Sequence, residues 1–331
     1  MWSRFSGCSY PFVVIFNVTH ECNFNCGYCC DRDFPTSDED LSTAQVRLLL
    51  DELSRAGVLR LSFLGGEPLM RPDIGEIVRH AVAGGLSCTM TTNGKYVKEN
   101  IPALRLLDSI GISLDGRKEN NDRVRGGGAF DTAMEAIAEC RKNGIKTVIN
   151  SVITKYTAGD IDFIAELARQ NGCSACFTAM AQQGQASGPA GNILPSTEEA
   201  CAALERIIEL KDAGAPLLFS SPSYRESLFW LKTAKDGEVK TGSAGTNCLA
   251  GRYFCLIDHN GDVYPCPRFM PAASRGNVLR NGLKEAMAMA AGHGCSGCSL
   301  TCSIELTRLF RLRLETIWGV AFNIALKAVR N

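Results

Sequence analysis

Between Pro11 and about Ala213, short apolar runs alternate with longer amphipathic stretches. Short runs rich in β-branched residues are typical of buried strands, whereas apolar positions repeated at helical spacing are typical of amphipathic helices. The expected strands are Phe12–Thr19, Val58–Leu64, Ser87–Thr92, Ser109–Leu114, Lys146–Ile153 and Cys173–Ala179. The expected helices are Thr43–Arg55, Ile74–Ala83, Asn100–Leu107, Asp131–Asn143, Ile161–Gln170 and Thr197–Ala213, the last with a Ser196/Glu199 capping box. Successive βα units predict an α/β fold with a parallel sheet, either doubly wound or closed towards a barrel.

The pattern changes after Ala213. Residues 214–247 are rich in Gly, Ser and Lys and are expected to form an irregular connection. Two further strands, Tyr253–Asp258 and Asp262–Cys266, flank an Asn-Gly pair that is typical of a hairpin turn. A helix is expected at Leu283–Ala291 and a final helix from about Ile304 to Ala328. The predicted domains are therefore a barrel at 1–213, a connection at 214–247, a small module at 248–303 and a C-terminal helix at 304–331.

Composition sets this chain apart only by its cysteines. Its 331 residues are 45% apolar and 21% charged, as in ordinary globular proteins. Lys+Arg and Asp+Glu both number 35, so the charge balance gives no general attraction to nucleic acid. The 16 cysteines would suit a secreted disulfide scaffold, but the sequence after Arg4 has no apolar run of a signal peptide. We therefore expect a cytoplasmic protein, in which clustered thiols are more often metal ligands than disulfides.

The first cysteine cluster directly follows the first expected strand. Cys22, Cys26 and Cys29 have the spacing C-x3-C-x2-C, and thiolate is the preferred ligand of iron–sulfur clusters. Three protein ligands on a 4Fe–4S cluster leave one iron open, as a catalytic zinc site keeps one position open. A zinc loop is the alternative, but no second C-x2-C knuckle or His pair lies nearby in the sequence. Cys30 has no partner in this spacing and is interpreted as a bystander.

Polar residues follow the later strands, where the ligands of parallel α/β folds bind. Two glycines after the second strand allow close approach of backbone to a ligand, and the carboxylate beside them can accept hydrogen bonds from an ammonium group. The candidate ligand-binding residues of these strand ends are Gly65, Gly66, Glu67, Asn93, Ser113 and Asp115. Arg125 is interpreted as a carboxylate partner or a solvated arginine, and Asn150 as a ribose contact or a hydrogen bond at the core edge. Cys173 and Cys176 are expected to be buried thiols.

The segment Cys22–Cys29 resembles the C-x3-C-x-aromatic-C signature of the radical S-adenosylmethionine (SAM) superfamily, with Tyr28 as the aromatic residue. This resemblance implies a partial (βα)6 TIM-like barrel and SAM bound to the open iron. It also implies cleavage of SAM to a 5′-deoxyadenosyl radical that abstracts hydrogen from substrate. Gly65–Glu67 resembles the family's GGE motif, which binds the methionyl amine of SAM. The resemblance further assigns Ser113 and Asp115 to the ribose and carboxylate of SAM.

The second cysteine cluster occupies the C-terminal module. Its members are Cys248, Cys255, Cys266, Cys295, Cys298 and Cys302. The spacings Cys248-x12-Gly261-x4-Cys266 and Cys295-x2-Cys298 resemble the auxiliary-cluster modules called twitch and SPASM. A full SPASM module continues with further cysteines, which this chain lacks, and six thiols cannot fully ligate two cubes. One auxiliary 4Fe–4S cluster held by Cys248, Cys266, Cys295 and Cys298 is therefore expected, with a set that uses Cys255 and Cys302, or a structural zinc at Cys295 and Cys298, as alternatives.

The resulting hypothesis is a radical SAM enzyme in which an auxiliary cluster assists oxidation or bond formation. The substrate is either a peptide or protein, or a small molecule such as a sugar, cofactor precursor or lipid, and the electron donor is a flavodoxin- or ferredoxin-like protein. The expected barrel start near Pro11 leaves no space before it for a leader-peptide-binding domain, which weakens the peptide alternative. A non-catalytic iron–sulfur or zinc protein is the alternative from a different class, but it would need no ligand-facing turns at successive strand ends.

The C-terminal segment carries apolar and basic residues together. Its uncharged stretch Thr316–Leu326 would span about 16 Å as a helix, well short of a hydrocarbon thickness of about 30 Å. This segment is therefore expected to pack on the barrel. Peripheral contact with a membrane surface or a lipid-like substrate is the alternative.

Overall fold

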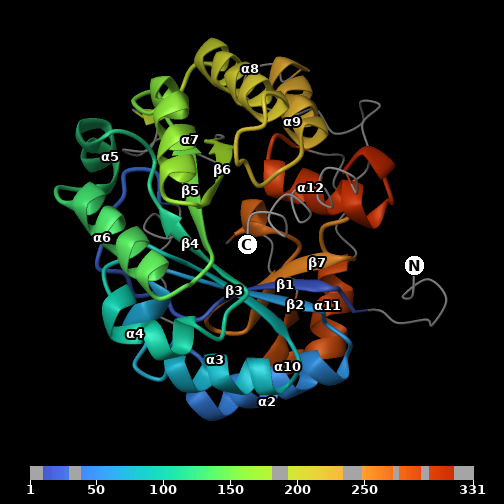
Figure 1. Cartoon of the computed structure of the whole chain (residues 1–331). Helices are drawn as coiled ribbons and strands as arrows, with labels where there is room; N and C mark the ends of the chain where they lie inside the picture. The colour runs from blue at the N-terminus through green and yellow to red at the C-terminus, as the bar shows by residue number, and fades with distance from the viewer. Residues whose placement is uncertain are drawn as a thin grey trace.

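A curved parallel sheet forms the frame of the molecule (Figure 1). The computed structural model describes residues 10–29, 39–180, 193–233, 248–270, 276–291 and 298–316. The first strands are β1 (Val13–Asn17), β2 (Arg60–Leu64), β3 (Ser87–Thr92), β4 (Ser109–Ser113), β5 (Thr147–Ile153) and β6 (Ser174–Ala179). They lie in the order β6-β5-β4-β3-β2-β1, and every neighbouring pair is parallel. The expected strands are confirmed, with slightly shorter ends.

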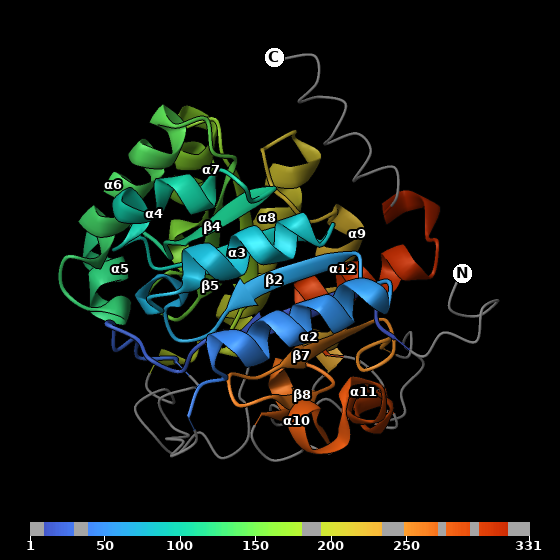
Figure 2. The ribbon, with the colours of Figure 1, turned by 90° about the horizontal axis from the view of Figure 1, so that it is seen from below.

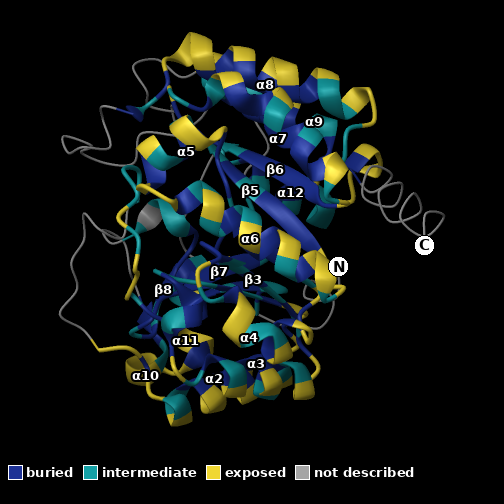
Figure 3. Ribbon diagram, turned by 60° about the vertical axis from the view of Figure 1, so that its left-hand side comes forward, coloured by how far each residue is buried: buried dark blue, intermediate teal, exposed yellow. Residues whose placement is uncertain are grey.

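Helices connect the strands and cover the outer face of the sheet (Figures 2 and 3). They are α2 (Thr43–Arg55), α3 (Ile74–Ala83), α4 (Val97–Leu104), α5 (Lys118–Arg125), α6 (Ala129–Lys142), α7 (Ile161–Gln170) and α8 (Thr197–Asp212). The capping box at Ser196 and Glu199 is confirmed. Helix α4 starts three residues before the expected Asn100, because Val97 and Leu104 are both buried by it. Helix α5 was not expected, since Val124 is its only apolar residue.

The two faces of the sheet have different chemistry. Alternate strand residues point to opposite faces, and one set, which includes Val14, Phe63 and Ile112, packs with the helices in the main hydrophobic core. The other set, which lines the inside of the curve, is largely polar. Its partly exposed members include Ser62, Thr89, Thr91, Ser113 and Asn150. The inside of the partial barrel is therefore suited to hold a polar ligand.

The C-terminal part extends the same sheet. Strand β7 (Phe254–Ile257) pairs in parallel with β1, and β8 (Asp262–Tyr264) pairs with β7 in the antiparallel hairpin that the Asn-Gly turn predicts. Strand β9 (Gly276–Asn277) then pairs with β8, so the described residues form one nine-stranded sheet. Short helix α10 (Val278–Asn281) leads into α11 (Leu283–Ala291), which packs on β8 and β9 as Figure 2 shows.

Two helix predictions need correction. The connection at 214–247 is not wholly irregular, because helix α9 (Ser221–Thr233) packs on α8 and buries Tyr224 and Trp230. Its Ser-Pro-Ser start and scattered apolar residues concealed it in the sequence. The final helix is not continuous from Ile304 to Ala328. Helix α12 (Thr301–Phe310) ends before Leu312, whose backbone is left-handed with φ 55°.

Helix α12 lies on the open side of the curved sheet. It contacts β6 and α9, its Leu306 packs with Phe254 of β7, and its Phe310 stacks on Phe12 with ring centroids 5.5 Å apart. This placement agrees with the expectation that the C-terminal segment packs on the barrel. The rest of that segment, residues 317–331, lies outside the described residues. Within the described ranges, no helix is both long and apolar enough to span a membrane.

Candidate active site

The cysteine loop lies against the end of β2 through backbone hydrogen bonds. Gly66 N donates to Thr19 O at 2.9 Å, and Glu67 N donates to Glu21 O at 2.7 Å. A Cβ atom on Gly65 would lie 2.3 Å from Thr19 O, and one on Gly66 would lie 2.2 Å from Glu21 O. Both distances are shorter than real Cβ contacts, so no larger residue fits at either position. The close approach that the two glycines permit is therefore, first of all, to the loop that carries the cysteines.

Glu67 joins the ends of β2 and β3. Its carboxylate is buried and accepts hydrogen bonds from Leu69 N at 3.0 Å, Thr92 Oγ1 at 2.6 Å and Asn93 N at 2.7 Å. Burial raises the pKa of Glu67, and these hydrogen bonds offset only part of that increase. Asn93 in turn donates from Nδ2 to Asn23 Oδ1 at 2.8 Å. Two of the expected motifs thus converge on the cysteine loop.

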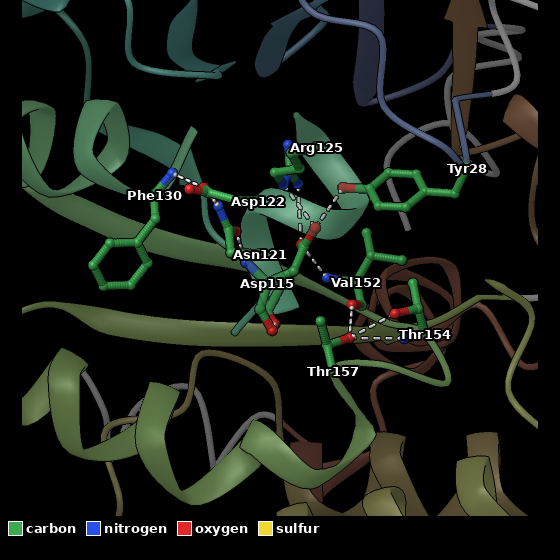
Figure 4. Close-up of polar contacts among 10 residues, drawn as sticks. Tyr28, Asp115, Asn121, Asp122, Arg125, Phe130, Val152, Thr154 and Thr157 are labelled. Carbon is green, nitrogen blue, oxygen red and sulfur yellow. Dashed lines mark hydrogen bonds and ion pairs between the residues drawn. The ribbon is translucent and has the colours of Figure 1, made fainter. Parts of the chain in front are cut away.

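Asp115 and Arg125 form a buried ion pair (Figure 4). Arg125 donates from Nε to Asp115 Oδ2 at 2.7 Å and from Nη2 to Oδ1 at 3.0 Å. The same carboxylate accepts the Tyr28 hydroxyl at 2.9 Å and Val152 N at 2.8 Å. Arg125 is only 8% exposed, so the solvated alternative for this residue is wrong. These four hydrogen bonds orient Arg125 and Tyr28 against the Asp115 carboxylate, and the contact of Asp115 with SAM that the resemblance implies stays a prediction.

The ion pair also places a cation beside the cysteine loop. The Arg125 guanidinium lies 5.4 Å from the centre of the Tyr28 ring, and Gly27 N donates to Val124 O at 2.8 Å. Burial raises the pKa of the Cys26 thiol; the nearby Arg125 opposes this shift, its partner Asp115 adds to it, and the pKa stays raised. Because a metal is ligated by the thiolate, metal binding at Cys26 would release a proton.

The three loop cysteines suit an iron–sulfur cluster better than a single metal ion. Cys22 is exposed and Cys26 and Cys29 are partly exposed, so a ligand can reach them. Among the residues that the structure describes, no three Cys, His, Asp or Glu side chains are close enough to hold one metal ion. Three accessible thiols on one loop beside a buried cation are a donor set for a thiolate-ligated cluster. Cys30 lies outside the described residues.

Ser113 and Asn150 sit side by side on the inner face, paired in register between β4 and β5. Asn150 donates from Nδ2 to Thr91 Oγ1 at 3.1 Å and accepts the Cys176 thiol at 2.9 Å. These contacts match the hydrogen bond at the core edge that was the alternative expectation for Asn150, although this residue remains partly exposed to the inside of the barrel. The ribose contact predicted for Ser113 and Asn150 stays a prediction. Cys173 and Cys176 are buried, as expected.

Sequence reasoning missed residues that act through tertiary contacts. Asn23 accepts a hydrogen bond from Asn93, and Asn121 Oδ1 accepts one from Asp115 N at 2.9 Å. Both residues stand among other polar residues with no periodic pattern. Of the two, only Asn23 could have been singled out from the sequence, because it lies inside the cysteine motif.

The second cysteine set is divided between the two faces of the sheet. Cys266 is in a small buried cluster with Phe254, against which Cys248 packs. Cys255, the next residue along β7, points to the opposite face and belongs to the main core between sheet and helices. Burial raises the pKa of Cys255 to about 12. The sheet thus separates Cys255 from Cys266, which argues against the alternative ligand set that contains Cys255.

The other auxiliary cysteines lie at the start of α12. Cys298 precedes this helix and is buried, and Cys302 is its second residue. Burial raises the pKa of Cys302 to about 11. Helix α12 also reaches Cys248, whose Sγ lies 3.8 Å from Thr307 Oγ1. Cys248 and Cys266 therefore share one side of the sheet with α12, and these two thiols fit a thiolate-ligated cluster. Cys295 lies outside the described residues.

Comparisons with known proteins identify the family. The family model of the radical SAM superfamily matches residues 16–168, and that of the SPASM iron–sulfur cluster-binding domain matches residues 248–291. The mycofactocin maturase MftC of Mycobacterium ulcerans (strain Agy99) is 32% identical over 288 residues, which cover 83% of this chain and 74% of that protein. The chain belongs to the radical SAM superfamily.

Two further similarities extend this assignment. An AdoMet-dependent heme synthase of Methanosarcina barkeri (strain Fusaro / DSM 804) is 29% identical, with 83% of this chain and 81% of that protein covered. The structure of Streptococcus suis SuiB bound to S-adenosylmethionine has a TM-score of 0.69 and 18% identity, covering 88% of this chain and 70% of that one. The expected partial barrel is thereby confirmed. The comparisons also confirm the expected radical SAM enzyme, with a 4Fe–4S cluster, SAM and an auxiliary iron–sulfur module of SPASM type.

Proposed function

We propose that this radical SAM enzyme is a maturase that modifies a peptide. The observation that supports the proposal is its similarity to MftC, which at 32% identity extends over 83% of the chain, a greater length than the radical SAM match at residues 16–168 alone. The polar inner face of the barrel is compatible with a substrate backbone, because its hydroxyl and amide groups can pair with peptide N–H and C=O groups.

Each motif of the barrel has a proposed part in the reaction. Cys22, Cys26 and Cys29 would hold the 4Fe–4S cluster, which when bound supplies the electron that cleaves SAM to methionine and a 5′-deoxyadenosyl radical. Glu67 and the Gly65-Gly66 turn would bind the methionyl amine, with the Asn93 turn beside them. Arg125, oriented by Asp115, would attract the SAM carboxylate. These side chains fix SAM before hydrogen abstraction, which is the contribution that positioning makes to such a reaction.

The auxiliary module would hold one 4Fe–4S cluster through Cys248, Cys266, Cys295 and Cys298. A cluster there can accept an electron from a substrate radical. This transfer would complete a net oxidation or a bond formation on the substrate. A flavodoxin- or ferredoxin-like protein would supply the electron for SAM cleavage.

The first experiment tests the chemistry of the barrel. Anaerobically reconstituted protein, reduced with dithionite and given SAM, is expected to release 5′-deoxyadenosine, and Cys26→Ala is expected to abolish this product. Iron and sulfide are each expected at about eight per chain if two cubes are present, and at about four if only one is. A count of about four would contradict the proposed auxiliary cluster.

The second experiment tests the substrate. Peptides encoded beside the gene are synthesised with deuterium at their side chains and incubated with enzyme and SAM. Deuterium in 5′-deoxyadenosine, together with a mass change in one peptide, would support the maturase. A similarity that spans 81% of an AdoMet-dependent heme synthase makes porphyrin modification the second candidate. Deuterium transfer from a labelled iron porphyrin, and none from any peptide, would assign that function instead.

A further inference from the structure

A polar contact joins the cysteine loop to the auxiliary hairpin. We call it the His–Asp joint, and it consists of His20, Asp40 and His259. His20 lies between β1 and Cys22, Asp40 precedes α2, and His259 occupies the turn between β7 and β8. His259 is only 2% exposed, although histidine in a hairpin turn is ordinarily solvated. The joint thus connects two segments near the first cysteine cluster to a hairpin far along the sequence.

Asp40 is the centre of the joint. His259 Nδ1 lies 3.0 Å from Asp40 Oδ1, and the same oxygen accepts a hydrogen bond from His20 N at 3.2 Å. The His20 and His259 rings lie 5.3 Å apart, centre to centre. Burial tends to raise the pKa of Asp40, but the polar contacts that its carboxylate makes with His259, with Thr19 and with the His20 backbone outweigh burial and lower that pKa. The charged carboxylate is therefore the form that the joint stabilises.

Backbone contacts reinforce the same connection. Leu41 N donates to His259 O at 2.8 Å, and Arg71 holds both Leu41 O, at 2.7 Å, and Val18 O, at 2.6 Å. On the hairpin side, Asp258 accepts hydrogen bonds from Asn17 Nδ2 at 2.9 Å and from His259 N at 3.0 Å. The end of β1 is therefore held to the hairpin turn as well as to its neighbouring strands.

The joint acts on the residues just before Cys22. Asp40 holds His20 from one side, and Glu67 N holds Glu21 O from the other. The backbone that leads to the first cysteine thus contacts Asp40, and through it the auxiliary hairpin, on one side. On the other side it contacts the Gly65-Gly66-Glu67 turn. A shift of the hairpin turn would move this backbone relative to that turn.

We propose that Asp40 and His259 are positioning residues for SAM cleavage, through which the auxiliary module fixes the start of the SAM-cluster loop. Neither residue is assigned to the cluster or to SAM. The role concerns the cleavage of SAM itself, so it does not depend on whether the substrate is a peptide or a porphyrin. A misplaced reacting group slows a reaction strongly, and one hydrogen bond to a charged group corresponds to about a tenfold change in rate.

The test compares variants of the full-length, reconstituted enzyme. His259→Leu and Asp40→Asn are expected to lower the rate of 5′-deoxyadenosine formation about tenfold per reduced SAM cluster, counted by electron paramagnetic resonance (EPR). The change that SAM induces in the EPR signal of this cluster should also weaken, whereas the auxiliary signal should not. His259→Asn keeps an N–H near the position of Nδ1 and should recover most of the rate. The double variant should lose little more than either single one, since paired residues are not additive.

The chain offers a matched control in its other described His–Asp pair. His80 Nε2 lies 2.7 Å from Asp51 Oδ1 between α3 and α2, away from both cysteine clusters. His80→Leu should leave the rate and the EPR signals unchanged. The proposal is overturned if His259→Leu and Asp40→Asn keep the full rate per cluster, or if His259→Asn is as slow as His259→Leu. Should His259→Leu fail to fold, Asp40→Asn and His259→Asn still decide between these outcomes.

Discussion

At the residue scale, Gly65 and Gly66 determine how closely the cysteine loop lies to the end of β2. Gly65 has a φ of 134°, which a residue with a side chain rarely adopts. The sequence predicted that both glycines allow the backbone to approach a ligand closely. The structure shows that the carbonyl groups of Thr19 and Glu21 occupy the space where side chains would begin. The GGE motif thus shapes the cluster loop in addition to any contact with SAM.

Gly66→Ala is expected to disrupt SAM cleavage. A Cβ atom would lie 2.2 Å from Glu21 O, so the loop must move away and Cys22 with it. A displacement of about 1 Å at a reacting group can cost about 100-fold in rate, and we expect a loss of that size in 5′-deoxyadenosine formation. Gly127→Ala is the control, because nothing lies within 4 Å of a Cβ atom there. Equal activity of the two variants would contradict this account of the motif.

Arg125→Leu is expected to destabilise the fold as well as SAM binding. It leaves the Asp115 carboxylate, whose side chain is fully buried beside Arg125, without its cation. Breaking one partner of a buried pair typically costs about 3–5 kcal/mol, which urea denaturation would measure as a lower free energy of unfolding. Arg206→Leu removes an exposed pair with Asp162 and should change little. Adding Asp115→Asn to Arg125→Leu should recover part of the loss, since the unpaired charge is then gone.

At the scale of elements, the sequence predicted the strands and helices whose apolar positions are periodic. Strands β1 to β6 and helices α2, α3, α7 and α11 were found because their buried positions recur at strand or helix spacing. Helices α5 and α9 were missed, since the first is nearly all polar and the second starts with Ser-Pro-Ser. In the site, the motif residues were predictable, but the partners of Asp115 and Asp40 were not. Those partners come from separate segments, and only the fold brings them together.

Strand β7 also gives a test of the auxiliary ligands. Its alternation puts Cys255 in the main core and Phe254 beside Cys266. Cys266→Ala is therefore expected to lower the iron content of the reconstituted protein by about four atoms per chain, the size of one cube. Cys255→Ala should leave the iron content unchanged. Iron and sulfide assays on both variants measure this difference. Loss of a cluster from Cys255→Ala with none from Cys266→Ala would restore the alternative ligand set.

At the scale of the whole molecule, the auxiliary segment and the barrel share one sheet and one core. Strand β7 covers the edge of β1, and Cys255, Ile257 and Val263 belong to the same hydrophobic core as Val14. The small cluster around Cys266 adds Leu306 of α12 to this connection. The sequence predicted a separate module at 248–303 because the βα rhythm stops before it. Strand pairing over that long separation cannot be deduced from periodicity.

Hydrogen exchange can decide whether the shared sheet behaves as one unit. Amides of β1 and β7 are expected to exchange with the same free energy of opening, because separating β7 would expose the edge of β1 and part of the main core. Native-state exchange of the full-length protein, read by mass spectrometry across a range of denaturant, would measure both. If β7, β8 and β9 open at a clearly lower free energy than β1 to β6, the auxiliary segment unfolds by itself. The boundary at 248 would then mark a separate folding unit, as the sequence predicted, and the shared sheet would be a docking arrangement only.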